Sequence, residues 1–435
     1  MIRLVNAGRS SSALSFLEGS QTSKPLSREE VLRDETLQRI QDMHPQANVH
    51  DRVPVPSQVV IQGDPLSFTA DELKEAVKRL PEESGAGRSA WTNELIQAVL
   101  GASPQLCNSV LRMFNRIADG SLLMSRHWTA SRMIFLRKEG REGEFRPIAI
   151  GESWLRLLGR MVCAKVQDQA RAVLSPLQYG VAFPCGAEIM AHQVKLVAEA
   201  MGKASLEDAN DDNPIVIVSV DSTNAFNTIR RSHIFDSVRQ RMPSLAKLFA
   251  WLYGGPSELQ LSTGETVANS ATGLRQGDPL GPLFYCLGTH TSLEAVRNDG
   301  TGTPLGYIDD TALICKRDEV NRVFGIYRAS QARLGLTVNL LKTKVLDFTQ
   351  PTDSVESFAR FLMVFVFSEY LLVIVMAPLM RTAAASPASF GHNYHKMHKR
   401  TSHSSVAPSA PICVQAHFRL YQRQTHSPCT NNPSR

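Results

Sequence analysis

Three aspartates have sequence surroundings that suit metal-assisted chemistry. Asp221 directly follows the β-branched run Ile215–Val220, while Asp309 and Asp310 stand between two apolar segments. If these segments are neighbouring strands, the three carboxylates meet at one end of one sheet. Clustered carboxylates repel one another unless a cation neutralises them, and Mg²⁺ prefers hard oxygen ligands of this kind. Two such ions about 3.5–4 Å apart would serve an in-line displacement at phosphorus.

Each carboxylate also has a purely structural interpretation. Asp-Asp is a common turn dipeptide, and an aspartate that ends a strand often caps the next element. The order of the surrounding motifs favours function over this alternative. Four motifs follow one another along the chain: Asp221-Ser-Thr-Asn-Ala-Phe226, Arg275-Gln-Gly-Asp-Pro-Leu280, Tyr307-Ile-Asp-Asp310 and Asn339-Leu-Leu-Lys-Thr343.

The second of these motifs is a Gly-rich turn that leads into an expected helix. Gly277 would let the backbone come close to a ligand, because glycine has no Cβ. Asp278 is the expected N-cap of the helix, and Pro279 is its expected first residue.

The elements that must position these residues follow from the local pattern. Ile215–Val220 predicts a strand covered on both faces, and Leu305–Ile308 with Thr311–Cys315 predicts a hairpin that turns at Asp309-Asp310. A helix that begins near Val320 should end at Gly335. Short strands and helices therefore alternate, which predicts an α+β fold. Upstream, helices are expected near 28–43, 69–80, 91–100, 105–118 and 153–173, and strands over 132–137 and 144–150.

Taken in order, these motifs resemble those of the reverse transcriptases of non-LTR retrotransposons, especially the site-specific elements that insert in spliced-leader genes. Lys138 with Phe145-Arg-Pro-Ile148 resembles the fingers motif, and Gly87–Ile96 resembles the additional N-terminal motif of this class. The resemblance covers about residues 65–350 and implies a right-hand polymerase. It divides the chain into an N-terminal extension (1–65), fingers (66–214), a palm with the catalytic aspartates (215–350) and an atypical tail (351–435).

The resemblance implies an RNA-directed DNA polymerase that extends a DNA primer on an RNA template with deoxynucleoside triphosphates. Asp221 and Asp309 would be the main Mg²⁺ ligands, with Asp310 completing the acidic cluster and Mn²⁺ as an alternative ion. Phe226 would pack under the incoming sugar and collide with a 2′-hydroxyl, the group that distinguishes RNA building blocks from DNA ones.

The remaining motif residues would bind the nucleotide. The resemblance implies that Lys138 and Arg146 hold the triphosphate, since fixed cations suit phosphoryl transfer. It places Lys342 near the leaving pyrophosphate. Each has a plainer alternative, since Phe226 could be ordinary core and the cations could be solvated. Gln276 and Gly277 would line the template–nucleotide pocket.

The chain departs from the family pattern in two places. Asn227 stands where the family often has aspartate, which leaves the metal ligand Asp221 in place. After about residue 350 neither a primer-grip hairpin nor a helical thumb is recognisable, so the tail is interpreted as disordered or as an out-of-frame or degenerate end. The alternative function is therefore an inactive element remnant that folds and binds nucleic acid without catalysis. The apolar run 361–380 is long enough for a bilayer, but Glu369 at its middle argues against a membrane span.

Composition, net charge and cysteine count limit the class of protein to which the chain can belong. The chain has 435 residues, of which 43% are hydrophobic and 20% charged, as in a globular protein. The net charge of +6 lies mostly in 351–435, so charge alone identifies no partner. Seven scattered cysteines without a CxxC pair argue against a disulfide framework or a four-cysteine zinc site and favour a reducing compartment. The resemblance implies an intracellular, nuclear protein.

Overall fold

The computed structural model describes residues 25–48, 51–123, 126–138, 143–207 and 213–347. All of these residues belong to one compact unit, Met1–Met376. The tail 351–435 and its apolar run lie outside the described residues. Within the described part, no helix is both long enough and apolar enough to cross a membrane.

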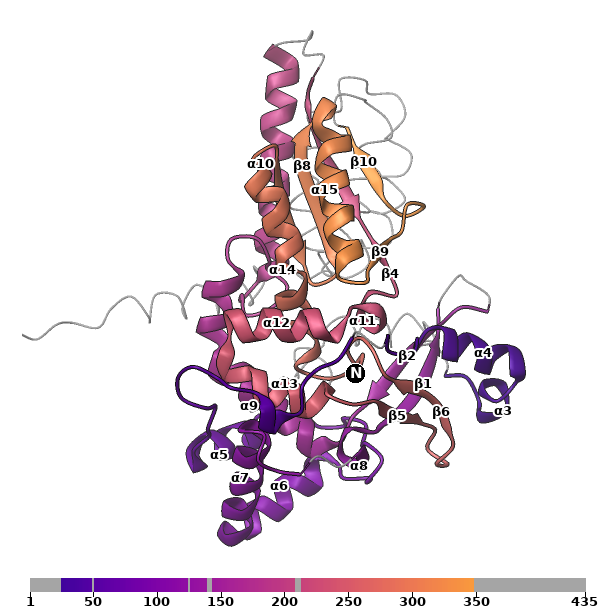
Figure 1. The fold of residues 1–435 in the computed structure, drawn as a ribbon, viewed down its shortest axis with the longest axis vertical. Helices are drawn as coiled ribbons and strands as arrows, with labels where there is room; N and C mark the ends of the chain where they lie inside the picture. Colours follow the sequence, from indigo (N-terminus) through magenta and orange to yellow (C-terminus); the bar gives the residue numbers. More distant parts are fainter. Residues whose placement is uncertain (1–24, 49–50, 124–125, 139–142, 208–212, 348–435) are drawn as a thin grey trace, which may run out of the picture. The chain divides into compact units, whose positions relative to one another are not determined.

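One four-stranded sheet carries the aspartates and has the order β10–β3–β8–β7. We call it the β3–β8 sheet (Figure 1). Its β3 spans Ile215–Val220, as the β-branched run predicts, and its middle residues are buried. Both neighbours of β3 in the sheet are antiparallel to it. The other strands are β7 (Gly302–Tyr307), β8 (Asp310–Lys316) and β10 (Lys344–Leu346).

Two helices cover one face of this sheet. They are α14 (Gly281–Asp299) and α15 (Val320–Arg333). Val216, Val218 and Val220 share one face of β3 and are buried in a cluster with residues from both helices. Gly335 follows α15 with a φ of +82°, a conformation that favours glycine, so the predicted helix end is confirmed.

A second four-stranded sheet, the β1–β2 sheet, has the order β2–β1–β5–β6. The antiparallel pair β1 (Ser131–Arg137) and β2 (Phe145–Ile150) confirms the predicted strands. Strands β5 (Ser257–Gln260) and β6 (Thr266–Ser270) complete the sheet. This sheet therefore combines segments from both sides of residue 215, and the domain limits drawn from the sequence stay predictions.

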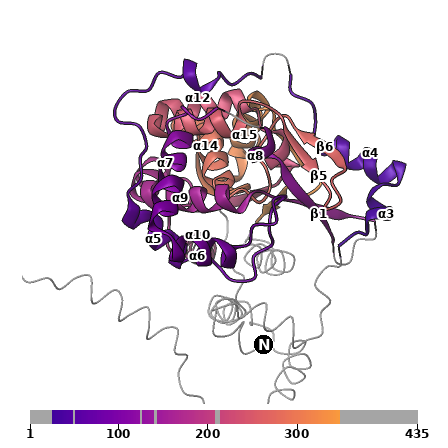
Figure 2. The ribbon, with the colours of Figure 1, turned by 90° about the horizontal axis from the view of Figure 1, so that it is seen from below.

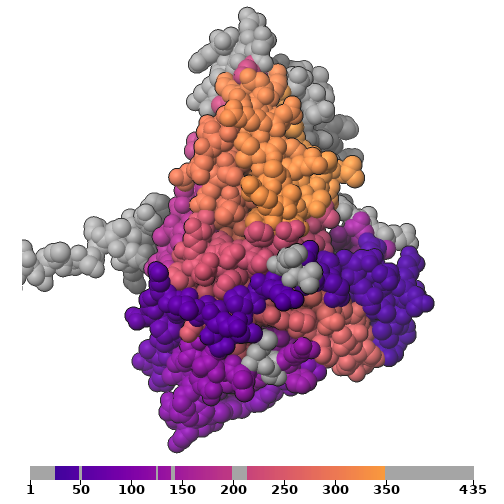
Figure 3. All heavy atoms as spheres, in the orientation of Figure 1, coloured from indigo at the N-terminus to yellow at the C-terminus, as the bar shows by residue number. Residues whose placement is uncertain are grey.

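Residues 25–48 of the N-terminal extension pack on the β1–β2 sheet, whereas Val59 belongs to the separate cluster formed by the helices. Helices α3 (Arg28–Val31) and α4 (Asp34–Asp42) bury Val31 and Ile40 in the same cluster as Met133. In Figure 3 the indigo segment, which begins at residue 25, lies across the face formed by later segments. The expected helix near 28–43 is therefore present as two short helices.

The largest buried cluster belongs to a group of helices, of which α5, α6, α7 and α9 were predicted from the sequence and α12 and α13 were not. Helix α5 begins after the predicted capping box, in which Thr69 Oγ1 accepts from Glu72 N and Glu72 accepts from Thr69 N. Figure 2 shows α5, α6, α7 and α9 gathered together. The helices of this group are α5 (Ala70–Lys78), α6 (Asn93–Ala102), α7 (Pro104–Ala118), α9 (Ser153–Leu174), α12 (Arg231–Arg241) and α13 (Ala246–Tyr253). Shorter or separate helices are α8 (Arg126–Thr129), α10 (Gly186–Glu207) and α11 (Ala225–Thr228).

Candidate active site at the end of the β3–β8 sheet

Strand pairing places the three aspartates at one end of the β3–β8 sheet. Val220 is paired with Thr311 on β8, so Asp221 comes one step beyond that pair, next to Asp310. Asp310 is paired with Tyr307 on β7, which leaves Ile308 and Asp309 as the two-residue loop of the hairpin. The prediction that the turn is Asp309-Asp310 is therefore wrong by one residue, because Asp310 already belongs to β8.

The hairpin turn is strained and is held by a residue that sequence reasoning missed. Ile308 has a φ of +56°, which is unfavourable for a β-branched residue. Buried Gln178 holds this turn from both sides: its Oε1 accepts from Ile308 N at 2.9 Å, and its Nε2 donates to Ile308 O at 3.2 Å. A Cβ on Gly180 would lie 2.4 Å from Ile308 N, so only glycine fits there. A glutamine in a loop carries no sequence signal for such a role.

Burial and mutual repulsion act on the carboxylates. Burial raises the pKa of Asp309, and the charge of Asp221 raises it further. Burial, then the charges of Asp309 and Asp221, raise the pKa of Asp310 to about 7. The three groups are therefore close enough to repel one another, as the sequence predicts for an acidic cluster. Such a cluster favours a positive partner.

A lysine lies against this cluster. Lys342 Nζ is 2.8 Å from Asp221 Oδ2, and the charge of Lys342 also lowers the pKa of Asp309 and Asp310. The backbone brings it there, since Asn339 N donates to Asp221 O at 2.8 Å. Next to this bond, β4 (Ser222–Thr223) pairs with β9 (Thr337–Val338).

The donor chemistry of the acidic cluster fits a divalent ion, because all three groups supply hard oxygens and two of them have raised pKa values. The arrangement is not a finished metal site. Within the described ranges, no three His, Cys, Asp or Glu side chains are grouped to hold one ion. The cation that contacts Asp221 in this structure is the Lys342 ammonium.

Phe226 lies just after the first aspartate and is half-buried. The turn before it uses Asn224, whose φ of +49° is in the left-handed region that asparagine tolerates. The Phe226 ring stacks on Tyr285 of α14, with centroids 4.7 Å apart and planes inclined by 13°. Tyr285 was not predicted. The structure therefore gives Phe226 a packed ring face, while its part in selecting the sugar stays a prediction.

The Gly-rich turn approaches β2. Gly277 has a φ of +125°, and a Cβ there would lie 2.4 Å from Ala149 O. Ala149 N donates to Gln276 O at 2.8 Å. The close approach that requires glycine is therefore to the chain itself, and the expected contacts of Gln276 and Gly277 with a template–nucleotide pair stay predictions.

The helix after this turn begins later than predicted. Helix α14 starts at Gly281, with Leu280 as its N-cap and Pro282 in its first turn. Asp278 caps the preceding turn, since its Oδ1 accepts from Leu280 N at 2.9 Å. The prediction of Asp278 as N-cap and Pro279 as first helical residue is wrong, because the turn needs two more residues before the chain becomes helical.

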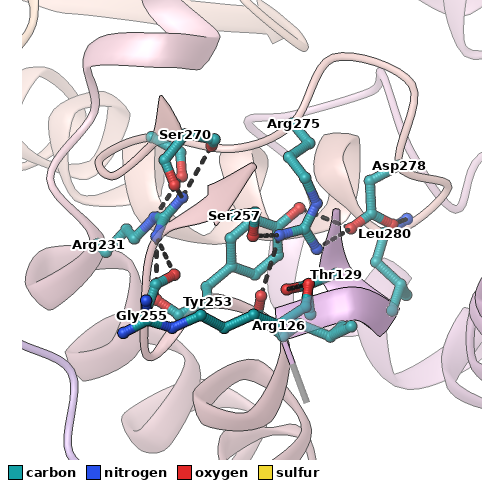
Figure 4. A network of polar contacts seen from close by, with 12 residues as sticks. Arg126, Thr129, Arg231, Tyr253, Gly255, Ser257, Ser270, Arg275, Asp278 and Leu280 are labelled. Carbon is teal, nitrogen blue, oxygen red and sulfur yellow. Dashed lines mark hydrogen bonds and ion pairs between the residues drawn. The ribbon is translucent and has the colours of Figure 1, made fainter. Parts of the chain in front are cut away.

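A buried polar network anchors the same turn (Figure 4). Arg275 donates to Leu252 O at 3.0 Å and to Ser257 Oγ at 2.8 Å, and it forms an ion pair with Asp278. Its guanidinium lies 4.2 Å from the centre of the Tyr253 ring. Tyr253 in turn donates to Asp278 Oδ2 at 2.6 Å. Arg275 and Asp278 thus hold the turn in shape, which the motif alone did not reveal.

Arg231 is the second guanidinium of this network, and it too was missed. It is 2% exposed, and burial lowers its pKa to about 9, with Arg275 contributing. It donates to backbone carbonyls on both sides, those of Gly255 at 2.9 Å and Gly273 at 2.8 Å among them. Asp51 accepts from Arg231 N and Ser232 N, so the N-terminal segment caps α12.

Lys138 and Arg146, the two cations of the segment that resembles the fingers motif, have different surroundings. Arg146 is exposed on β2, and its charge lowers the pKa of Asp309, so it lies within electrostatic reach of the cluster. Lys138 forms an ion pair with Glu144 at 2.9 Å across the β1–β2 hairpin. The structure thus brings Arg146 toward the aspartates and gives Lys138 a different partner.

A mixed fold of helices and sheets with three carboxylates at one sheet end is the arrangement that the resemblance to reverse transcriptases predicts. The reverse transcriptase (RNA-dependent DNA polymerase) family matches residues 136–361, more than half of the chain. The chain belongs to this family, whose members are nucleotidyltransferases.

A curated relative agrees with the family match. The chain is 27% identical over 306 residues to the retrotransposable element SLACS 132 kDa protein of Trypanosoma brucei gambiense. The aligned part covers 68% of this chain and 24% of that protein. The two matches confirm the motif-based prediction of a non-LTR retrotransposon reverse transcriptase. The predicted truncation after about residue 350 stays a prediction.

Proposed function

We propose that this chain polymerises DNA on an RNA template as part of a non-LTR retrotransposon, acting on nucleic acid in the nucleus. The observation that carries this proposal is the convergence of Asp221, Asp309 and Asp310 at one sheet end, where strand pairing sets Asp221 beside Asp310 and the charge of Asp221 adds to the burial that raises the pKa of Asp309 and Asp310. Residues 66–214 would act as fingers and 215–350 as palm. The substrates are a DNA primer, an RNA template and deoxynucleoside triphosphates.

The residues around the sheet end have complementary roles. Asp221 and Asp309 would hold Mg²⁺, or Mn²⁺, with Asp310 beside them, and a bound ion lowers the pKa of the primer 3′-hydroxyl. Arg146 is an exposed cation within electrostatic reach of Asp309 and would bind the triphosphate. Gln276 and Gly277 would line the nucleotide pocket, and Lys138 would join them only after leaving Glu144.

Primer extension tests the proposed function. A labelled DNA primer on an RNA template, supplied with deoxynucleotides and Mg²⁺, should be extended by the full chain. Extension should stop when the ion is removed with a chelator and resume when it is restored. A chain that binds the primer–template but never extends it, with either Mg²⁺ or Mn²⁺, would support the alternative of an inactive remnant that binds nucleic acid.

Phe226→Ala is expected to raise incorporation of ribonucleotides relative to deoxynucleotides by at least about tenfold, since about 1.4 kcal/mol of lost steric exclusion already gives that factor. The half-buried ring stacks on Tyr285, so its loss opens space beside α14 without removing a charged group. Single-nucleotide extension with each nucleotide type measures the ratio. Phe226→Tyr keeps a ring and should keep the exclusion. If the alanine variant rejects ribonucleotides as wild type does, the ring is ordinary core packing.

A further inference from the structure

Backbone pairings before and after Lys342 in the sequence fix its position next to Asp221. Before the lysine, β9 pairs with β4, and Asn339 N donates to Asp221 O at 2.8 Å. After it, Lys344 of β10 is paired with Ser219 of β3. The turn between them is closed by Lys342 N and Thr343 N, which donate to Asn339 O at 3.1 and 2.9 Å. The fold therefore presents this side chain to the acidic cluster.

The Lys342 side chain is more exposed to solvent than the carboxylate that it contacts. Lys342 is 52% exposed, whereas Asp221 is 30% exposed. A lysine ammonium is a compact charge on a flexible four-carbon stem, so rotation about that stem can carry it away from the carboxylate. The ion pair at 2.8 Å thus joins an exposed, flexible type of side chain, carried by a hydrogen-bonded backbone segment, to the first aspartate of the cluster.

The same ammonium opposes a second cation at the cluster. With its Nζ 2.8 Å from Asp221 Oδ2, it already neutralises part of the charge of that carboxylate. A divalent ion that approaches Asp221 must therefore displace a like charge. A triphosphate that arrives with the ion offers the lysine a new anionic partner nearby.

We propose that Lys342 is a displaceable counter-ion, which occupies Asp221 in the nucleotide-free protein and moves to the triphosphate when a nucleotide enters. This inference rests on the proposed function, because it takes the cluster to be the ion site. Such a lysine makes ion binding and nucleotide binding cooperative. It weakens binding of the ion when no nucleotide is present, and it strengthens binding when ion and nucleotide are both present. The polymerase would then hold its ion firmly only when a nucleotide is present.

Binding of Mn²⁺ to the full chain without nucleotide tests the first half, with free Mn²⁺ followed by electron paramagnetic resonance. Lys342→Met keeps the stem and removes the charge, and it should bind Mn²⁺ about two- to fivefold more tightly than wild type, the range that an exposed ion pair supports. Lys344→Met removes an equal charge from the same segment and should have a smaller effect. Asp221→Asn should abolish the tight Mn²⁺ site and so locate it.

Binding of dTTP at saturating Mn²⁺, followed by calorimetry without primer, tests the second half. Here Lys342→Met should bind dTTP more weakly than wild type, so the two effects of one substitution have opposite signs. A merely structural role would weaken both. If wild type and Lys342→Met bind Mn²⁺ with equal affinity while wild type still extends primers, the counter-ion proposal is wrong and the proposed function stands. No Asp221-dependent Mn²⁺ binding in either protein would overturn it together with the proposed ion site.

Discussion

Asp309→Asn is expected to reduce primer extension by at least about 10³-fold, because an ion-holding carboxylate contributes several kcal/mol to the transition state and each 1.4 kcal/mol is tenfold in rate. The same substitution should leave the free energy of unfolding equal to or above that of wild type. Burial and the charge of Asp221 raise the pKa of Asp309 in the folded protein, so its ionised form is disfavoured by folding. A neutral amide of the same size removes that cost above the raised pKa and changes nothing at low pH.

Urea unfolding at pH 8 and single-turnover extension together check this prediction. Asp318→Asn is a matched control, since it removes an exposed carboxylate from η3 (Arg317–Glu319), beyond the far end of β8. It should change neither extension nor stability by a measurable amount. An Asp309→Asn protein that extends primers as wild type does would show that the ion is held elsewhere. One that loses activity and unfolds more easily would give Asp309 a structural role.

Local patterns predicted much of the fold because their causes are local. The β-branched run of β3 and the capping box at Thr69 each depend on residues within a few positions. The left-handed glycine after α15 is of the same kind. The aspartates were found from their motifs, and the prediction that they share a sheet end followed from placing each beside a strand. The family resemblance added the ion or nucleotide group that each motif is expected to bind, which spacing alone does not give.

The remaining features depend on contacts between distant segments, and these leave no local pattern. Gln178 holds the turn at Ile308, 130 positions away, and this contact maintains a φ that turn statistics would not assign to isoleucine. That is why the turn was misplaced by one residue. The pairing of Lys342 with Asp221 likewise arises only once β9 and β10 have joined the segment around β3.

Buried polar side chains are the largest group of features that the sequence analysis did not predict. Arg231 is one of two adjacent arginines at the start of α12, a helix that the sequence analysis did not predict, and it is buried while Arg230 is exposed. Charged side chains are almost never fully buried unless they are paired, so two adjacent arginines in a sequence indicate exposed side chains. Its partners are backbone carbonyls, whose positions no sequence motif encodes.

Arg231→Leu is expected to lower the free energy of unfolding by about 3–5 kcal/mol, because it leaves several buried carbonyls without donors. The guanidinium bonds the carbonyl oxygens of Ser270 at 2.9 Å and Gly273 at 2.8 Å, which lead directly into the Gly-rich turn. It also lies 5.2 Å from the centre of the Tyr253 ring, and Arg275 lies against the same ring. The loss should therefore loosen the turn as well as the fold.

Urea unfolding and limited proteolysis of three variants check this prediction. Arg231→Lys keeps the charge but cannot reach carbonyls on both sides, so it should still be clearly destabilised. Arg239→Leu, on the same helix, removes an arginine that is 61% exposed and pairs weakly with Asp236 at 3.7 Å. That control should stay within about 0.5 kcal/mol of wild type. Cleavage in the Arg231→Leu protein should begin between 270 and 280. If Arg231→Leu and Arg239→Leu unfold at the same urea concentration, the buried network does not anchor the turn.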